Sequence, residues 1–133
     1  MRGQLHHIEI YVSNFERSRE FWKWLLELLG YEEISPGETI TNFRLGNTYI
    51  VLVQTEEKFL DVPYHRCRTG LNHLAFHGGS RADIDALTEK LRERNIKILY
   101  EDRHPHAGGN NYYAVFFEDP DRIKVEVVAS GIK

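Results

Sequence analysis

The sequence lacks three features that would each assign it to a special class of protein. It has a single cysteine, Cys67, which excludes a framework of intramolecular disulfides and fits a reducing compartment. It has no excess of positive charge, because its formal net charge is −3, and this argues against a nucleic-acid-binding surface. It also has no apolar run long enough to span a bilayer. Residues 1–12 lack the basic start and continuous apolar core of a secretory leader. We therefore expect a cytoplasmic protein without nucleic-acid or membrane partners.

The composition that is present is that of an ordinary globular chain. The 133 residues are 41% hydrophobic and 28% charged, which favours one compact domain over a disordered segment. Seven histidines are a high number for this length, and their positions need an explanation.

Three predicted strands carry a polar side chain on the face opposite their aliphatic residues. Their ranges are 5–12, 71–77 and 123–129, and each alternates with a period of two. The polar side chains of interest are His7, His73 and Glu126. Two histidines and a carboxylate together make a three-ligand site for a divalent metal, with open positions for water or substrate. Taken singly, each is also compatible with a solvated or hydrogen-bonded surface residue.

Two amphipathic helices are expected between the strands. The first begins at Ser13 in a capping box with Glu16 and ends at Gly30, and the second runs from Ser80 to Asn95. The remaining strands are expected at residues 31–35, 41–45, 48–54, 96–101 and 112–117. Each half of the chain therefore reads as a strand, a helix and three further strands, which is an internal repeat.

The repeat gives the polar residues matched positions. His7 and His73 open the two halves, and alignment of the last strands places Val51 over Glu126. The two helices should cover the aliphatic faces of the strands, so that the opposite faces line a concavity.

The chain resembles the vicinal oxygen chelate superfamily, the glyoxalase/bleomycin-resistance/extradiol-dioxygenase group. The resemblance covers nearly the whole chain and rests on HHIEIYVSN, GLNHLAF and FFEDPDRIKVEVV in this order and spacing. It implies an α+β fold of two βαβββ modules that form a curved mixed-sheet cup with helices on the convex face. The implied single domain consists of module one at about 1–55, a linker at about 56–69 and module two at about 70–133.

The resemblance also implies a metal centre and an assembly. The ligands would be His7, His73 and Glu126, around a divalent ion that could be Zn, Ni, Mn, Fe or Co. The implied partners are a small-molecule substrate and a second copy of the chain in a homodimer.

The chain departs from the family pattern in two places. Arg122 stands where a glycine usually follows Asp-Pro-Asp, so the turn type could differ. Val51 stands where glyoxalase I has a fourth protein ligand, and neither Tyr49 nor Val53 restores the carboxylate. The set that remains resembles the two histidines and one glutamate of fosfomycin-resistance enzymes and extradiol dioxygenases.

Other polar residues are candidates for catalysis or substrate binding. Glu9 could act as a general base or be solvated or paired with Lys124, and His77 could transfer protons or simply be exposed. His6 competes with His7 as a ligand, but alternation places it on the aliphatic face. The candidates for substrate contact are Tyr11, Tyr49, Arg44, Lys124 and His104, with Arg66 and Arg68 as further cations for an anionic group.

The leading hypothesis is a metal-dependent enzyme that acts on a small molecule with vicinal oxygens. It would be a lyase or isomerase, or would add a thiol or water as fosfomycin-resistance enzymes do. The alternatives are a metal-free protein of the bleomycin-resistance type that sequesters a ligand, and a single-domain extradiol-type dioxygenase.

Overall fold

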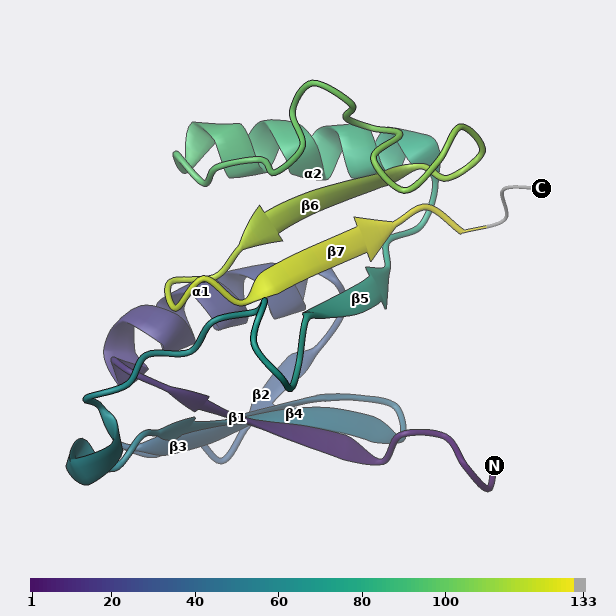
Figure 1. The fold of residues 1–133 in the computed structure, drawn as a ribbon. Coiled ribbons are helices and arrows are strands. Elements are labelled where there is room, and N and C mark those ends of the chain that lie inside the picture. The colour runs from purple at the N-terminus through teal and green to yellow at the C-terminus, as the bar shows by residue number, and fades with distance from the viewer. Residues whose placement is uncertain (131–133) are drawn as a thin grey trace. The chain divides into compact units, whose positions relative to one another are not determined.

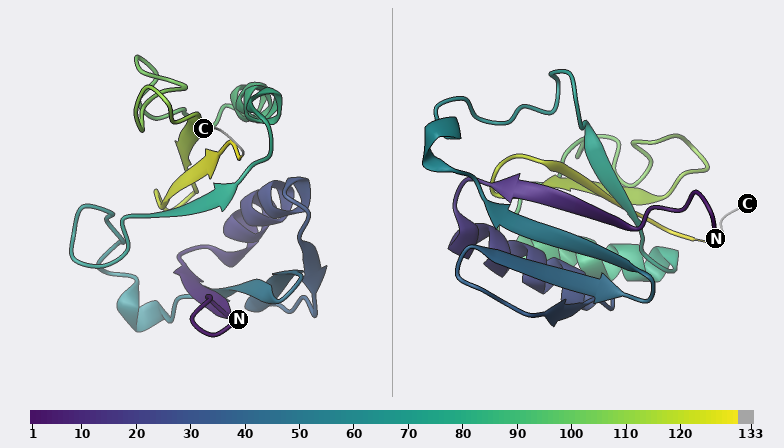
Figure 2. Two further views of the ribbon diagram at one scale, coloured as in Figure 1. Left: turned by 90° about the vertical axis from the view of Figure 1, so that its right-hand side faces the viewer. Right: turned by 90° about the horizontal axis from the view of Figure 1, so that it is seen from below.

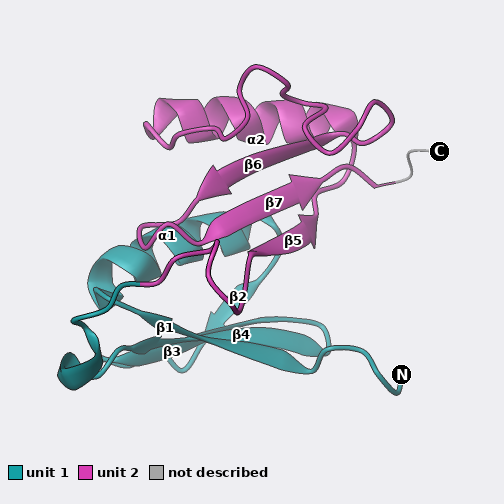
Figure 3. Cartoon of the chain, in the orientation of Figure 1, with its two compact units in different colours: residues 1–63 teal, residues 64–133 magenta. Residues whose placement is uncertain are grey.

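The structure, a computed structural model, describes residues 1–130 and divides the chain into two compact units. The first unit comprises residues 1–63 and the second begins at Tyr64 (Figure 3). Each unit contains one helix and one sheet of mixed strand directions, which confirms the predicted α+β class.

The first unit is a four-stranded sheet with one helix (Figure 1). Its elements are β1 (His7–Val12), α1 (Phe15–Leu28), β2 (Glu32–Ile34), β3 (Ile40–Leu45), β4 (Thr48–Gln54) and a 3-10 turn, η1 (Glu57–Phe59). The strand order is β1-β4-β3-β2, with β1 parallel to β4 and the other pairs antiparallel. The order of strand, helix and three strands predicted for this half is therefore confirmed.

Helix α1 packs on β2, β3 and β4 along one face of this sheet (Figure 2). It buries Trp22, Leu25 and Leu26 completely, as the apolar stripe of the sequence predicts. The predicted cap at Ser13 is wrong by one residue. Asn14 is the N-cap, because its Oδ1 accepts a hydrogen bond from the backbone N–H of Arg17 at 3.1 Å.

The second unit is a three-stranded sheet with one helix. Its elements are β5 (His73–His77), α2 (Arg81–Glu93), β6 (Ala114–Glu118) and β7 (Lys124–Val128), and the strand order is β5-β7-β6. Helix α2 begins in a complete capping box between Ser80 and Asp83, and Asn95 ends it with a φ of 59°, both as predicted. No helix within residues 1–130 is long and apolar enough to cross a bilayer.

The strand predicted at residues 96–101 is wrong. Only one bridge forms there, between Ile98 and Phe117, because the chain turns away at Tyr100, whose φ is 57°. The following loop returns over one face of the sheet, where Leu99 packs with Ala114 and Phe116. This loop brings side chains of residues 100–113 onto the face that carries Glu126.

The pairing registers of the two units confirm that Val51 and Glu126 are equivalent. His7 pairs with Tyr49, so Glu9 pairs with Val51 two residues later. In the second unit the residue two after His73, Ala75, pairs with Glu126. Each of these two residue pairs thus contains one carboxylate. It is Glu9 on β1 in the first unit and Glu126 on β7 in the second.

The turn between β6 and β7 explains how the chain accommodates Arg122. The carbonyl of Asp119 accepts from the N–H of Arg122 at 2.9 Å, which closes a four-residue turn around Pro120. The Oδ1 of buried Asp119 accepts from the N–H groups of Asp121 and Ile123 at 2.9 and 2.7 Å. Arg122 has a φ of 67°, in the left-handed region that a glycine enters without strain. Arg122 therefore keeps the left-handed backbone conformation that a glycine would adopt at this position.

Candidate metal site

His73 is held in the orientation of a metal-ligating imidazole. Its Nδ1 lies 2.7 Å from Oδ1 of Asn72, and the Nδ2 of Asn72 donates to the carbonyl of Arg66 at 3.2 Å. Because the amide nitrogen of Asn72 is engaged with that carbonyl, its oxygen faces the imidazole and accepts a hydrogen bond from the N–H at Nδ1. The Nε2 of His73 is thereby left as the nitrogen available to a metal.

Glu126 is buried and faces that nitrogen. It is 4% exposed, and its Oε1 lies 3.2 Å from Nε2 of His73. Two donors bound to one metal at about 2.1 Å lie roughly 3.0–3.4 Å apart in octahedral or tetrahedral geometry. The observed spacing therefore fits two ligands of one divalent ion, and one nitrogen and one carboxylate oxygen suit the metals predicted.

The other oxygen of Glu126 is occupied within the protein. Its Oε2 accepts a hydrogen bond from the hydroxyl of Tyr112, on the loop before β6. Burial, then this hydrogen bond and the charge of Glu126, raise the pKa of Tyr112 to about 12. Tyr112 is thus a neutral donor at physiological pH.

The third predicted ligand belongs to the other unit. His7 is exposed at the start of β1 in the first unit, whereas His73 and Glu126 belong to the second. Within residues 1–130 no three His, Cys, Asp or Glu side chains are arranged as a metal site. The structure thus brings two of the predicted ligands together, and the participation of His7 stays a prediction.

His7 lies in an aromatic cluster on the exposed face of its sheet. Its ring stacks on Tyr49 with centroids 4.6 Å apart and planes 5° apart, and the Cζ of Arg44 lies 4.9 Å from the Tyr49 ring. The sequence analysis used strand alternation to place His6 and His7 on opposite faces. His6 precedes β1, however, so alternation does not apply to it. The two imidazoles instead approach with Nδ1 atoms 2.9 Å apart.

The alternation predicted for β1 is confirmed by burial. His7, Glu9 and Tyr11 are exposed, whereas Ile10 and Val12 are buried. Glu9 lies two residues from His7, and it makes no ion pair within residues 1–63. Tyr11 lies four residues along the strand, about 13 Å from His7 at the usual rise.

His77 and His104 occupy less central positions in the second unit. The Nδ1 of His77 lies 3.2 Å from Oγ of Ser130, at the opposite end of β5 from His73. His104 is half-buried in the loop before β6, and this burial lowers the pKa of its imidazole. A role in proton transfer or substrate contact stays a prediction for each.

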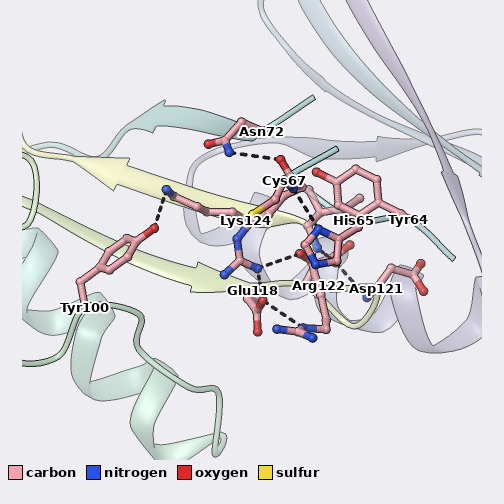
Figure 4. Close-up of polar contacts among 12 residues, drawn as sticks. Tyr64, His65, Cys67, Asn72, Tyr100, Glu118, Asp121, Arg122 and Lys124 are labelled. Carbon is pink, nitrogen blue, oxygen red and sulfur yellow. Dashed lines mark hydrogen bonds and ion pairs between the residues drawn. The ribbon is translucent and has the colours of Figure 1, made fainter. Parts of the chain in front are cut away.

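Two of the predicted anion-binding cations of this unit, Lys124 and Arg66, differ in their contacts, and Figure 4 shows the contact between Lys124 and Tyr100. The Nζ of Lys124 donates to the hydroxyl of Tyr100 at 2.8 Å and lies over the rings of Tyr100 and Phe116. The guanidinium of Arg66 forms an ion pair with Glu118, which also accepts from Nε of Arg122 at 3.3 Å. Arg66 therefore braces the β6–β7 turn, while Lys124 has no carboxylate partner within residues 64–130.

Sequence reasoning missed Asn72, Tyr100 and Tyr112. Asn72 directly precedes the predicted ligand His73, and this adjacency is the one feature of the sequence that could have indicated its contact with the imidazole. The alternation predicts a strand that includes Tyr112, but β6 begins at Ala114 and Tyr112 lies on the preceding loop. Periodicity carries no information about which loop side chain contacts Glu126.

Comparisons with known proteins identify the family of the chain. A family model described as the Glyoxalase/Bleomycin resistance protein/Dioxygenase superfamily matches residues 4–127. The uncharacterised protein YqjT of Bacillus subtilis (strain 168) is 54% identical over 125 residues, covering 94% of this chain and 98% of YqjT. The metallothiol transferase FosB of Staphylococcus epidermidis is 28% identical over 129 residues, covering 97% of this chain and 85% of FosB.

A solved structure gives the same result for the fold. The crystal structure of a candidate glyoxalase from Bacillus halodurans has a TM-score of 0.95 and 58% sequence identity, and 96% of each chain is covered. The chain therefore belongs to the Glyoxalase/Bleomycin resistance protein/Dioxygenase superfamily.

Proposed function

We propose that the protein is a divalent-metal-dependent enzyme that acts on a small molecule with vicinal oxygens. In this proposal the two units form one domain, and His7, His73 and Glu126 hold the metal. The observation that carries the proposal is the pair of donors in the second unit. Nε2 of His73 and Oε1 of Glu126 face each other at 3.2 Å, while Asn72 holds the proton on Nδ1.

That arrangement favours a bound cation. A neutral imidazole with its proton on Nδ1 presents a lone pair to a carboxylate oxygen, and two lone pairs at this distance repel. A metal ion between them removes the repulsion, as does a second proton on the imidazole. The similarity to FosB, which is named as a metallothiol transferase, supports the proposal that this protein binds a metal.

The surrounding residues suit a small, oxygen-rich substrate. The metal would supply Lewis-acid polarisation of the substrate oxygens. Lys124, whose ammonium has no carboxylate partner within residues 64–130, would bind a negatively charged group, and Glu9 would accept a proton from the substrate. The reaction classes that we propose are a lyase or isomerase reaction and the addition of a thiol or water. We further propose that the enzyme is cytoplasmic and homodimeric.

Elemental analysis of freshly purified protein, together with thermal melting, tests the proposal. We expect roughly one first-row metal ion per chain and a melting temperature that rises when the metal-free protein is titrated with Mn²⁺ or Zn²⁺. The variant Glu126→Gln should lose this rise, because an amide is a poor ligand. Glu118→Gln is the matched control, since Glu118 braces the turn with Arg66 and should leave metal binding intact.

Two outcomes would contradict the proposal. Absence of a metal above background, with no rise of the melting temperature on titration, would favour the metal-free ligand-sequestering alternative. Equal metal binding by wild type and Glu126→Gln would remove Glu126 from the ligand set.

A further inference from the structure

Tyr112 contacts the proposed metal ligand Glu126 on the side away from His73. The Oε1 of Glu126 faces Nε2 of His73, and Oε2 accepts the hydrogen bond from the hydroxyl of Tyr112. A carboxylate can bind a metal through one oxygen or through both. The hydrogen bond from Tyr112 is charge-assisted and competes with a metal for Oε2.

The loop fixes the position of the Tyr112 ring. The ring approaches the backbone of Gly108 so closely that a Cβ at residue 108 would clash with Cδ1 of Tyr112. The backbone N–H of Tyr112 donates to the carbonyl of Gly109 at 3.1 Å, which fixes the backbone from which the ring projects. The hydroxyl of Tyr113, the next residue, donates instead to Asp85 of α2. The position of the Tyr112 ring thus rests on Gly108 and on the backbone of its own loop.

We propose that Tyr112 is a positioning residue that restricts Glu126 to coordination through Oε1 and thereby keeps one metal position open for the substrate. This inference rests on the proposed function, because it needs Glu126 to be a ligand. An open coordination position is what separates a catalytic metal site from a closed structural one. With the Tyr112 hydroxyl in place, Oε2 is engaged; without it, Oε2 is free to take the position meant for substrate.

The absorption spectrum of the Co²⁺-substituted protein tests this inference without any substrate. Co²⁺ absorbs more weakly as its coordination number rises, so a second bond from Glu126 lowers the visible absorptivity. We expect Tyr112→Phe to bind Co²⁺ with a visible absorptivity reduced roughly twofold, since the phenyl ring keeps the packing and loses only the hydroxyl. Tyr113→Phe is the matched control, because it loses a phenol–carboxylate hydrogen bond to Asp85 away from Glu126 and should keep the wild-type spectrum.

Gly108→Ala provides an independent variant, because the added methyl group pushes the Tyr112 ring while the hydroxyl is retained. It should reproduce the spectral change of Tyr112→Phe. A wild-type spectrum in both variants, or an equal change in Tyr113→Phe, would overturn the role of Tyr112. Failure of the wild-type protein to bind Co²⁺ would overturn the proposed function as well, so the two failures are distinguishable.

Discussion

His73 and Glu126 lie on adjacent parallel strands, and Nε2 of the first faces Oε1 of the second at 3.2 Å. Register alone does not produce this contact, because the strand partner of Glu126 is Ala75 and that of His73 is Lys124. The contact is diagonal across the ladder, and it needs both side chains to be held. Asn72 holds the imidazole and Tyr112 holds the carboxylate. Hydrogen-bond partners of this kind orient the ligands in metal proteins, so their removal should lower the affinity for the metal.

Asn72→Leu should weaken metal affinity by about 10- to 100-fold, because the imidazole of His73 loses the acceptor that fixes its proton on Nδ1. Isothermal titration with Zn²⁺ measures the effect. Asn72→Asp keeps an acceptor for Nδ1 and loses only the donor to the carbonyl of Arg66, so its affinity should stay near that of wild type. Equal affinities of the Leu variant and wild type would show that Asn72 does not orient the ligand.

Val51→Glu tests the equivalence of the two ladders. The new carboxylate stands at the register position of Glu126, where the sequence comparison with glyoxalase I expects a fourth ligand. Val51 is 8% exposed, so the metal-free variant should melt at a lower temperature because it buries an unpaired charge. If a metal is bound next to this position, saturating Zn²⁺ should raise the melting temperature more in Val51→Glu than in wild type. A variant that Zn²⁺ stabilises no more than wild type would place Val51 away from the metal. Val53→Glu, two residues further along β4, is the control.

Much of the fold could be predicted because alternation and capping are local signals. The faces of β1, the cap of α2 and the end of that helix at Asn95 are set by residues within a few positions of each other. The equivalence of Val51 and Glu126 was also predictable, because alignment of the last strands of the two halves places one residue over the other.

The features that the sequence did not predict depend on contacts between distant residues or on competing local ones. The strand expected at residues 96–101 does not form, because Tyr100 adopts a left-handed backbone conformation and the chain then turns back over the sheet. Ser13 and Asn14 are both good helix caps, and only the geometry of the entering chain decides between them. Tyr112 reaches Glu126 from 14 residues away, and no periodic pattern encodes that contact.

Arg122→Gly should stabilise the protein by about 1 kcal/mol. The left-handed conformation of Arg122 is strained for a residue with a Cβ, and a glycine relieves that strain at a smaller entropic cost. Urea unfolding measures the change. Arg122→Ala keeps a Cβ and loses the contact with Glu118, so it should be no more stable than wild type. A glycine variant no more stable than the alanine variant would show that the Cβ of residue 122 is not strained, and one less stable than wild type would show that the contact with Glu118 outweighs the strain.

The ion pair between Arg19 and Glu33 should make the stability of the first unit depend on pH. Burial would raise the pKa of Glu33, but the hydrogen bonds from Arg19 and Thr41 and the charge of Arg19 outweigh it and lower the pKa. Nε and Nη2 of Arg19 donate to the two carboxylate oxygens of Glu33, at 2.8 and 2.7 Å. Because the pKa is lower in the folded state, the stabilisation is present above the unfolded pKa and disappears as the pH falls through the folded pKa.

Glu33→Gln should accordingly lower the free energy of unfolding by about 1–3 kcal/mol at pH 7, with a difference that shrinks below about pH 4. Urea unfolding of both proteins at several pH values measures it. A difference that is independent of pH would show that the loss comes from packing and not from the charge of Glu33.

The most direct test of the metal centre is anomalous diffraction from a crystal grown with Mn²⁺. We expect one strong anomalous peak bound by His7, His73 and Glu126, with Oε2 of Glu126 still accepting the hydrogen bond from Tyr112. A peak bound by other residues, or a structure in which Mn²⁺ contacts His73 and Glu126 but His7 lies elsewhere, would contradict the three-ligand site.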